Sequence, residues 1–129
     1  MWCCTASLRG FNGIYRYNIS QNDGAKHGVI DWREGHEGSM AYNNTIYLGE
    51  GIDREWLKNG YTGGKSDAKF YNNIVVNKGN MTPGKGFNEQ EIDYESNIFV
   101  GFDEVPSNDY NIDSGRPEIC GSWNRWKRN

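Results

Sequence analysis

The densest collection of groups capable of acid–base chemistry lies between residues 22 and 37. Both histidines of the chain, His27 and His36, fall in this stretch, and carboxylates lie near each of them. A carboxylate pair with a histidine beside it can perform general acid–base chemistry on a substrate such as a sugar. Asp23, His27 and Asp31 are therefore candidate catalytic residues. The alternative is a solvated turn, which we favour because charged loops usually belong to the surface.

A second group of charged residues follows shortly afterwards. Glu50, Asp53 and Glu55 lie close together in the sequence, with Arg54 among them. Ca²⁺ prefers several oxygen ligands, so these three carboxylates are candidate calcium ligands. We expect two stretches, 50–64 and 77–86, to leave the regular structure as loops. In repeat proteins such insertions gather on one face and commonly form the binding surface.

Aromatic side chains offer a further kind of binding surface, because their apolar faces can stack on sugar rings. Trp32 and Trp56 are candidates if they are exposed, and the equal alternative is that they fill the core. Tyr17, Tyr42 and Tyr71 are expected at equivalent outward positions in successive repeats. There they would form either an exposed aromatic stripe for a glycan chain or a stacked outer face, and stacking is the safer prediction.

A sequence repeat predicts the elements that position these residues. Four segments share the pattern Φ-x-x-Asn-x-Φ, in which Φ is usually aromatic or aliphatic. They are YRYNIS (15–20), AYNNTI (41–46), FYNNIV (70–75) and YESNIF (94–99). The fixed asparagines are Asn18, Asn44, Asn73 and Asn97, and they recur about every 25 residues. A near-constant period of this size is the signature of a solenoid.

The composition selects one kind of solenoid. Leucine-rich repeats are excluded, because the only leucines are Leu8, Leu48 and Leu57. Helical repeats need a period of about 3.6 residues, and Gly and Asn interrupt nearly every candidate window. Imperfect alternation of apolar and polar residues instead predicts strands at 13–20, 28–32, 39–48, 68–77 and 92–102. We therefore expect an all-β parallel β-helix of about four coils.

The repeat also predicts which residues stack between coils. The two Φ positions should point inward and form the rows Tyr15/Ala41/Phe70/Tyr94 and Ser20/Ile46/Val75/Phe99. The fixed asparagine should occupy the bend between strands, where its tolerance of left-handed φ is useful. Aligned one coil apart, Asn18, Asn44, Asn73 and Asn97 can then form a ladder of amide hydrogen bonds. We assign these asparagines a structural role.

Bulk properties exclude several classes of function. The formal net charge is −3, so no basic field exists for nucleic acid. No run of apolar residues is long enough to span a membrane, and the first residues lack the pattern of a signal peptide. Three cysteines, Cys3, Cys4 and Cys120, have the spacing of neither a disulfide framework nor a metal site.

The strings YRYNISQND (15–23), AYNNTIYL (41–48), FYNNIVVN (70–77) and SNIFVG (96–101) resemble right-handed parallel β-helix repeats of the pectate-lyase-like superfold. Within it, they resemble large secreted bacterial proteins associated with polysaccharide breakdown. The resemblance covers roughly residues 12–112. It implies a right-handed β-helix, a polysaccharide or glycan as partner, and an extracellular or cell-surface location.

The resemblance does not carry a catalytic site with it. Pectate lyases of this fold hold Ca²⁺ with clustered acidic residues, but no family motif positions Glu50, Asp53 and Glu55 in that role. The Gly-His-Gly of polygalacturonases is matched only in halves, by His27-Gly28 and Gly35-His36. This superfold hosts lyases, hydrolases, epimerases and adhesins, so the fold alone names no reaction.

Three regions are expected along the chain: an irregular segment at 1–11, the coils at 12–112 and an irregular tail at 113–129. The tail is basic and rich in tryptophan. One permitted set of codons for residues 116–129, read in a neighbouring frame, encodes the kind of extended segment that commonly follows the last strand in proteins of this type. We therefore expect an out-of-frame tail and a fragment of a longer protein.

Three hypotheses for the function follow. The chain is part of a polysaccharide-active lyase, hydrolase or epimerase; or it is a non-catalytic glycan-binding or adhesin solenoid; or it is a scaffold without an active site. Convergence of carboxylates with a histidine or arginine on one outward face would favour the first. Binding of glycans without a product would favour the second.

Overall fold

The computed structural model describes residues 6–7, 12–25, 28–31, 38–57, 67–84 and 92–112. These residues form strands and no helix. One sheet has the order β11-β8-β5-β2 and contains Ile14–Arg16 (β2), Met40–Tyr42 (β5), Ala68–Tyr71 (β8) and Ile92–Glu95 (β11). We call it the first sheet.

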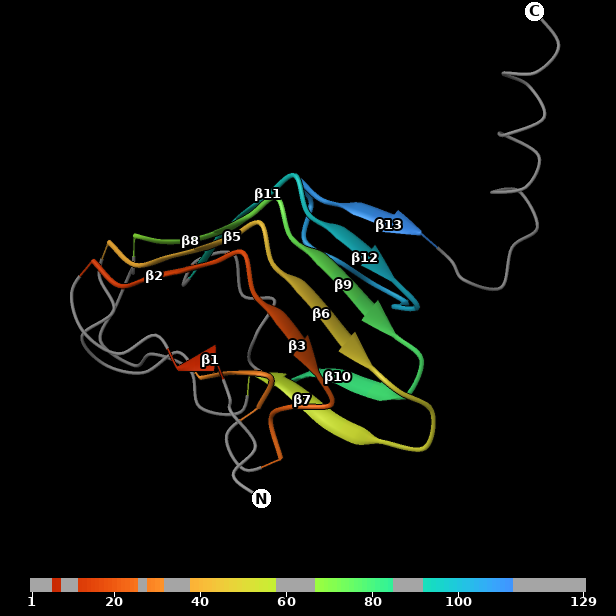
Figure 1. Ribbon diagram of the computed structural model, residues 1–129. Coiled ribbons are helices and arrows are strands. Elements are labelled where there is room, and N and C mark those ends of the chain that lie inside the picture. The colour runs from red at the N-terminus through yellow and green to blue at the C-terminus, as the bar shows by residue number, and fades with distance from the viewer. Residues whose placement is uncertain are drawn as a thin grey trace, which may run out of the picture.

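The second sheet has the order β13-β12-β9-β6-β3. Its strands are Ile19–Gln21 (β3), Thr45–Leu48 (β6), Ile74–Asn77 (β9), Ile98–Val100 (β12) and Tyr110–Ile112 (β13). Four further strands form two pairs, β1–β4 and β7–β10; they are Ala6–Ser7 (β1), Ile30–Asp31 (β4), Asp53–Leu57 (β7) and Asn80–Gly84 (β10). Figure 1 shows the first and second sheets meeting at a bend, with β7 and β10 below them.

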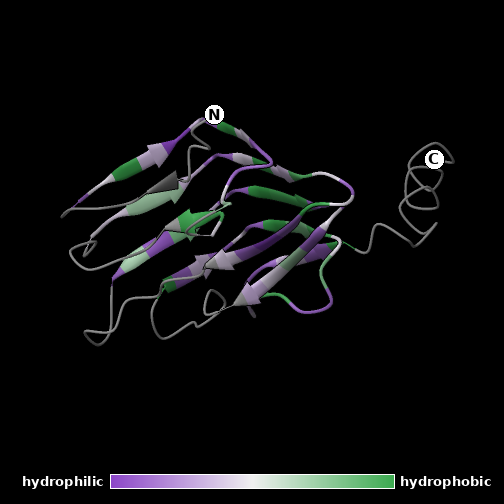
Figure 2. Cartoon of the chain, turned by 90° about the horizontal axis from the view of Figure 1, so that it is seen from below, coloured by the Kyte–Doolittle hydropathy of each residue, from purple (hydrophilic) through white to green (hydrophobic). Residues whose placement is uncertain are grey.

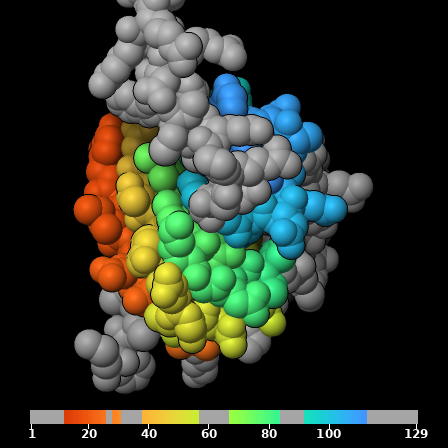
Figure 3. Space-filling view, turned by 90° about the vertical axis from the view of Figure 1, so that its right-hand side faces the viewer, coloured from red at the N-terminus to blue at the C-terminus, as the bar shows by residue number. Residues whose placement is uncertain are grey.

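Every strand pairing in the described part of the chain is parallel. From β1 to β12 the chain visits the groups of strands in a fixed order, and β13 then follows β12 in the second sheet. We call β2–β4 coil 1, β5–β7 coil 2, β8–β10 coil 3 and β11–β12 coil 4. In Figure 3 successive coils lie as adjacent bands from red through yellow and green to blue. This all-β, all-parallel arrangement is that of a parallel β-helix fragment, as the repeat predicts. No helix among the described residues is long and apolar enough to cross a membrane.

The register between coils follows the repeat. In the first sheet Tyr15 pairs with Ala41, Ala41 with Phe70 and Phe70 with Tyr94. In the second sheet the pairs are Ser20–Ile46, Ile46–Val75 and Val75–Phe99. Both predicted rows are therefore confirmed.

Burial alternates along most of the strands as the pleat requires, and Figure 2 shows hydrophilic and hydrophobic residues mixed along most of them. The buried apolar core takes residues from all three groups of strands; its largest fully buried side chains are Trp56, Phe70, Phe99, Leu48 and Val75. Edge-to-face contacts join the aromatic members, with ring centroids 5.2 Å apart for Trp56–Phe70 and 6.0 Å apart for Trp56–Phe99. Because the coils share this core, no coil can bury its apolar face alone.

The bend between the two sheets is made one residue earlier than the sequence predicts. Left-handed φ was expected at the fixed asparagines, but it occurs at the preceding residues: Tyr17 (56°), Asn43 (55°), Asn72 (53°) and Ser96 (58°). Bending there turns the backbone N–H and the side chain of each following asparagine along the stack. The fixed asparagines themselves are buried in coils 2 to 4.

Hydrogen bonds join these asparagines in series, and we call the series the asparagine row. Both the backbone N–H and the Nδ2 of Asn44 donate to Oδ1 of Asn73, each at 2.9 Å. Asn73 donates in the same two ways to Oδ1 of Asn97, at 2.9 and 3.0 Å. Asn18 donates likewise to Oδ1 of Asn44, at 3.0 and 3.2 Å. Each oxygen thus accepts two bonds from the coil before it.

The two stretches expected to be loops contain strands instead. Within 50–64 the strand β7 forms, and within 77–86 the strand β10 forms, and the two pair in parallel from Asp53↔Asn80 to Leu57↔Gly84. The prediction failed because neither stretch carries the Φ-x-x-Asn-x-Φ pattern and both are rich in charge, Gly or Pro. Among the side chains whose burial is described, β7 has one buried residue, Trp56, and β10 has one, Met81, and these fix the inward faces.

Candidate functional site

The outward face of the first sheet carries the most developed row of polar and aromatic side chains. Strand pairing places Arg16 beside Tyr42 and Tyr42 beside Tyr71. Tyr71 in turn pairs with Glu95 on β11. We call these four residues the outer row. It runs across all four coils, from a cation through two phenols to an anion.

The two central tyrosines of the outer row stack on each other. Their ring centroids lie 4.9 Å apart with an interplanar angle of 11°. Nη1 of Arg16 donates to the hydroxyl of Tyr42 at 3.0 Å, and its guanidinium lies 5.9 Å from the centroid of that ring. The hydroxyl of Tyr71 lies 4.0 Å from Sδ of Met40 on β5. Each ring therefore leans toward the preceding coil.

Tyr17 is not equivalent to Tyr42 and Tyr71, contrary to the expectation from the sequence. The register pairs Arg16 with Tyr42, so Tyr17 falls one residue later, at the bend with positive φ. Tyr17 lies two residues after the first Φ position of its repeat, whereas Tyr42 and Tyr71 each lie one residue after theirs. The ring of Tyr17 still meets Tyr42 edge-on at 6.3 Å, with 70% of the residue exposed. It extends the aromatic surface at coil 1.

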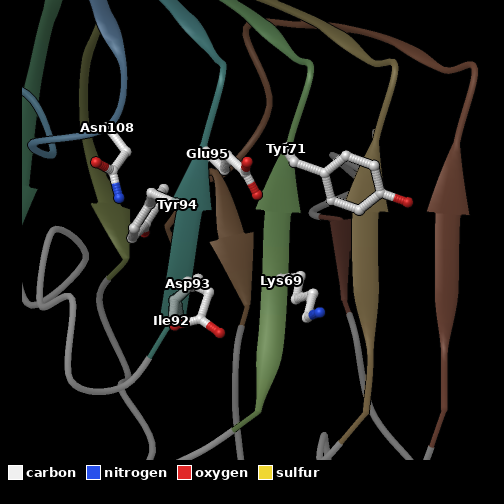
Figure 4. Close-up of a pocket in the computed structure, with 7 residues that line it drawn as sticks. All are labelled: Lys69, Tyr71, Ile92, Asp93, Tyr94, Glu95 and Asn108. Atoms are coloured by element: carbon white, nitrogen blue, oxygen red, sulfur yellow. The ribbon is translucent and has the colours of Figure 1, made fainter.

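A shallow hollow of about 250 Å³ lies next to Tyr71, over β8 and β11. It is lined by Lys69, Tyr71, Ile92, Asp93, Tyr94, Glu95 and Asn108. Figure 4 shows Tyr71 leaning away from β8 with its ring face visible, while Lys69, Asp93 and Glu95 lie nearby. The carboxylates of Asp93 and Glu95 accept hydrogen bonds and the ammonium of Lys69 donates them. An aromatic face beside such groups is suited to a polar ligand with an apolar surface, such as a sugar.

The hydroxyl of Tyr71 is held in its neutral form. Partial burial raises its pKa above the ordinary 10.0, and the phenols of Tyr42 and Tyr17 raise it further, while Arg16 acts in the opposite direction. The hydroxyl therefore remains a donor as well as an acceptor throughout the neutral range.

A second hollow of about 260 Å³ lies over β7 and β10. Asp53 and Glu55 lie two residues apart on β7, so they share its outward face, and both are exposed. The register places Asn80 and Thr82 beside them. Gly24, Ala25, Gly28 and Arg54 complete the lining.

The predicted calcium ligands are not gathered in one place. Glu50 is exposed in the turn after β6, outside the residues that line the second hollow. Among the residues that the structure describes, no group of three His, Cys, Asp or Glu side chains is arranged to hold a metal ion. Asp53 and Glu55 alone remain a pair.

The predicted catalytic set is only partly described. Asp23 accepts a hydrogen bond from the hydroxyl of Ser20 at 2.6 Å, a local contact within the turn after β3. His27 lies outside the described residues, and Asp31 is described only as a backbone member of β4. The trio therefore stays a prediction.

Of the two candidate tryptophans, Trp56 cannot stack on a ligand, because it is 0% exposed. It lies on the inward face of β7, and its Nε1 donates to the hydroxyl of Tyr94 at 3.0 Å. Because residues 50–64 were expected to form a loop, the sequence did not predict which way the side chain of Trp56 points. Alternation along β7 places it inward. Trp32 lies outside the described residues, as do the segments 1–5 and 113–129.

Sequence reasoning missed Arg16 of the outer row and three charged residues that line the first hollow. Lys69, Asp93 and Glu95 are not among the residues predicted from the sequence, although alternation places them on the face that carries Tyr42 and Tyr71. The available signal was their position: each lies directly beside an inward core residue, Phe70 or Tyr94. Applying the pleat to every repeat would have found them.

Comparison with known proteins gives one informative match. A curated lacto-N-biosidase from Bifidobacterium longum subsp. longum is 34% identical over 104 residues, which cover 78% of this chain. The chain spans only 6% of the length of that relative. No protein-family model matches, and no solved structure matches.

Proposed function

We propose that this chain is a glycan-binding segment of a larger carbohydrate-active protein and that the saccharide lies along the outer row. The observation that carries the proposal is the leaning stack of Tyr42 and Tyr71 on the outward face, with centroids 4.9 Å apart. Both tyrosines are half-buried, and their stack spans two coils within a row that crosses all four. This geometry suits an extended chain of sugars better than a single small molecule.

The polar ends of the outer row supply the directional contacts. Arg16 retains guanidinium N–H groups beyond the one that binds Tyr42, and these can donate to hydroxyl or carboxylate oxygens of a sugar. At the other end, Asp93 and Glu95 can accept from sugar hydroxyls, and Lys69 can donate. Aromatic contact supplies the affinity, and these hydrogen bonds orient the chain.

The comparison supports a carbohydrate ligand and suggests a first set of probes. Because the relative is a lacto-N-biosidase, oligosaccharides that end in lacto-N-biose should be tested first. Uronate polymers should be tested alongside them, because Arg16 favours an anionic sugar. A panel that contains both will identify the ligand used in the experiments below.

The direct test compares two tyrosine substitutions on different sheets. Isothermal titration with the identified oligosaccharide should show that Tyr71→Ala weakens binding at least about tenfold, as loss of one aromatic contact predicts. The matched control is Tyr110→Ala, because Tyr110 is 64% exposed but lies on the second sheet. The control should bind like the unmodified chain. Equal loss in both variants, or no loss in Tyr71→Ala, would refute the outer row as the binding surface.

One second candidate is favoured by a specific observation. Asp53 and Glu55 share the outward face of β7 above a hollow that also holds Asn80 and Thr82. Two carboxylates on one face are the groups that glycoside hydrolysis requires. If the segment is catalytic, Asp53→Asn and Glu55→Gln should each abolish product formation while leaving binding at the outer row intact. Absence of any product with the unmodified chain would remove this candidate.

A further inference from the structure

The asparagine row has a direction, and that direction gives it two different ends. Bonds between the fixed asparagines run one way only, because each asparagine donates to the Oδ1 of the asparagine in the next coil. The bonds to the preceding coil go instead to backbone carbonyls, those of Tyr15, Ala41 and Phe70. At coil 4 the backbone N–H and Nδ2 of Asn97 donate to Oδ1 of Asp109, at 2.9 and 3.0 Å. The aspartate has no side-chain N–H, and its backbone N–H donates to the carbonyl of Pro106 at 3.2 Å. The row therefore ends at Asp109.

The opposite end of the row is open within the described residues. Oδ1 of Asn18 occupies the place at which Oδ1 of Asn44, Asn73 and Asn97 each accept two hydrogen bonds. No described residue donates to it. The side chain of Asn18 does donate, to the carbonyl of Arg16 at 2.8 Å and to Asn44, so its orientation is already fixed.

The strands on either side of Asn18 are also open on this edge. No strand of the described part pairs with β2 or β3 other than β5 and β6. In coil 2 the amides of Met40 and Thr45 donate to the carbonyls of Gly13 and Asn18 in coil 1, at 2.8 and 2.9 Å. Ile14 and Ile19 hold the equivalent positions in coil 1. Their amides therefore point away from coil 2, toward the open edge.

The position of β1 shows that the stack extends beyond coil 1. On one side, the amide of Val29, next to β4, donates to the carbonyl of Glu55 in β7 at 2.9 Å. Ile30 and Asp31 of β4 pair with Ala6 and Ser7 of β1. β1 thus takes the place of the third strand in a coil that precedes coil 1. The first and second strands of that coil would lie against β2 and β3.

We propose that the edge formed by β2, Asn18 and β3 binds one further parallel β-coil that carries an asparagine at its bend. The bound coil contributes a strand beside β2, a strand beside β3, and a backbone N–H and amide NH₂ that donate to Oδ1 of Asn18. A second copy of this chain cannot extend the row from its coil 4 end, because Asp109 lacks those donors. The partner is a coil of the asparagine type.

The test supplies such a coil and measures hydrogen exchange. A second copy of residues 38–50 (GSMAYNNTIYLGE), which contains β5, the bend and β6, is joined ahead of the full chain by a flexible Gly/Ser linker. The tether gives an effective concentration of order millimolar. Docking should slow exchange of the Ile14 and Ile19 amides at least about tenfold, because both become hydrogen-bonded. Unchanged exchange at both amides would overturn the proposal.

Two matched variants of the graft separate the row from simple strand addition. In the grafted copy, Asn44→Asp removes the amide donor and should abolish the protection. Asn43→Asp, one residue earlier at the exposed bend, should retain it. Equal protection in both grafts would overturn the role of the asparagine. Protection that rises with protein concentration in the chain without a graft would show instead that a second copy fills the edge.

Discussion

Asn97 and Asp109 are joined by two hydrogen bonds to a single carboxylate oxygen, at 2.9 and 3.0 Å, although only 12 residues separate them along the chain. The intervening segment, 101–109, returns directly to the second sheet without forming strands in the first sheet or beside β10. Asp109 thereby takes the place of a fifth asparagine and terminates the asparagine row.

Removal of that terminal acceptor should destabilise the last coil. Asp109→Ala leaves the backbone N–H and Nδ2 of Asn97 without their acceptor, at a cost of about 1–3 kcal/mol. Asp109→Asn keeps an oxygen in place and should cost less than about 1 kcal/mol. Urea unfolding of both variants checks this prediction. Equal midpoints for Ala and Asn would contradict it.

The middle of the row should be more sensitive than its end. The two N–H groups of the buried Asn73 amide are shared among three acceptors, Ala41 O, Tyr71 O and Asn97 Oδ1, and its Oδ1 accepts two bonds from Asn44. Asn73→Ala should therefore lower the free energy of unfolding by at least about 3 kcal/mol, because several buried groups lose partners. Asn72→Gly, at the exposed bend with φ of 53°, is the matched control and should be near neutral. Thermal unfolding of the two variants separates these outcomes.

The buried pair Trp56–Tyr94 should show energetic coupling. Trp56→Phe removes the donor to the hydroxyl of Tyr94 and part of the ring volume, at a cost of about 2–4 kcal/mol. Tyr94→Phe removes the acceptor alone. The double variant should be less destabilised than the sum of the single variants, as a double-mutant cycle by chemical denaturation can measure. Strict additivity would mean that the hydrogen bond contributes nothing.

Because the pKa of Tyr71 is raised, the free energy of unfolding changes with pH in the alkaline range. Because burial raises this pKa in the folded state, the folded chain holds the proton more tightly than the unfolded chain. The resulting stabilisation is fully present below the ordinary value of 10.0 and is lost as the pH rises through the folded pKa. Tyrosinate absorbance should show a late step that Tyr71→Phe removes and Tyr110→Phe leaves in place. A late step that survives in Tyr71→Phe would contradict the assignment.

The repeat made the stacking of the first and second sheets predictable from the sequence. Its two Φ positions define rows that the register reproduces, because a parallel stack repeats the same environment once per coil. The strands β7 and β10 were not predictable in the same way. Their inward faces are marked by Trp56 and Met81 among the described side chains, and these residues are recognisable as inward only once the core is assembled.

Asp109 escaped prediction for a related reason. It follows Asn97 at half the usual spacing, and an aspartate does not match the fixed asparagine. Hydrogen-bonding capacity, rather than residue identity, decides its place in the row. The outer row was half visible: Tyr42 and Tyr71 were identified, whereas Arg16 and Glu95 emerged only from the register.

The surface at which a glycan binds tests the proposed role of the outer row most directly. The backbone amides of the uniformly ¹⁵N-labelled chain can be followed by NMR while the oligosaccharide identified from the panel is added. The outer row predicts that the largest shifts lie on β5, β8 and β11, around Tyr42, Tyr71 and Glu95. Shifts confined to β7 and β10 around Asp53 and Glu55, or to the second sheet, would contradict it.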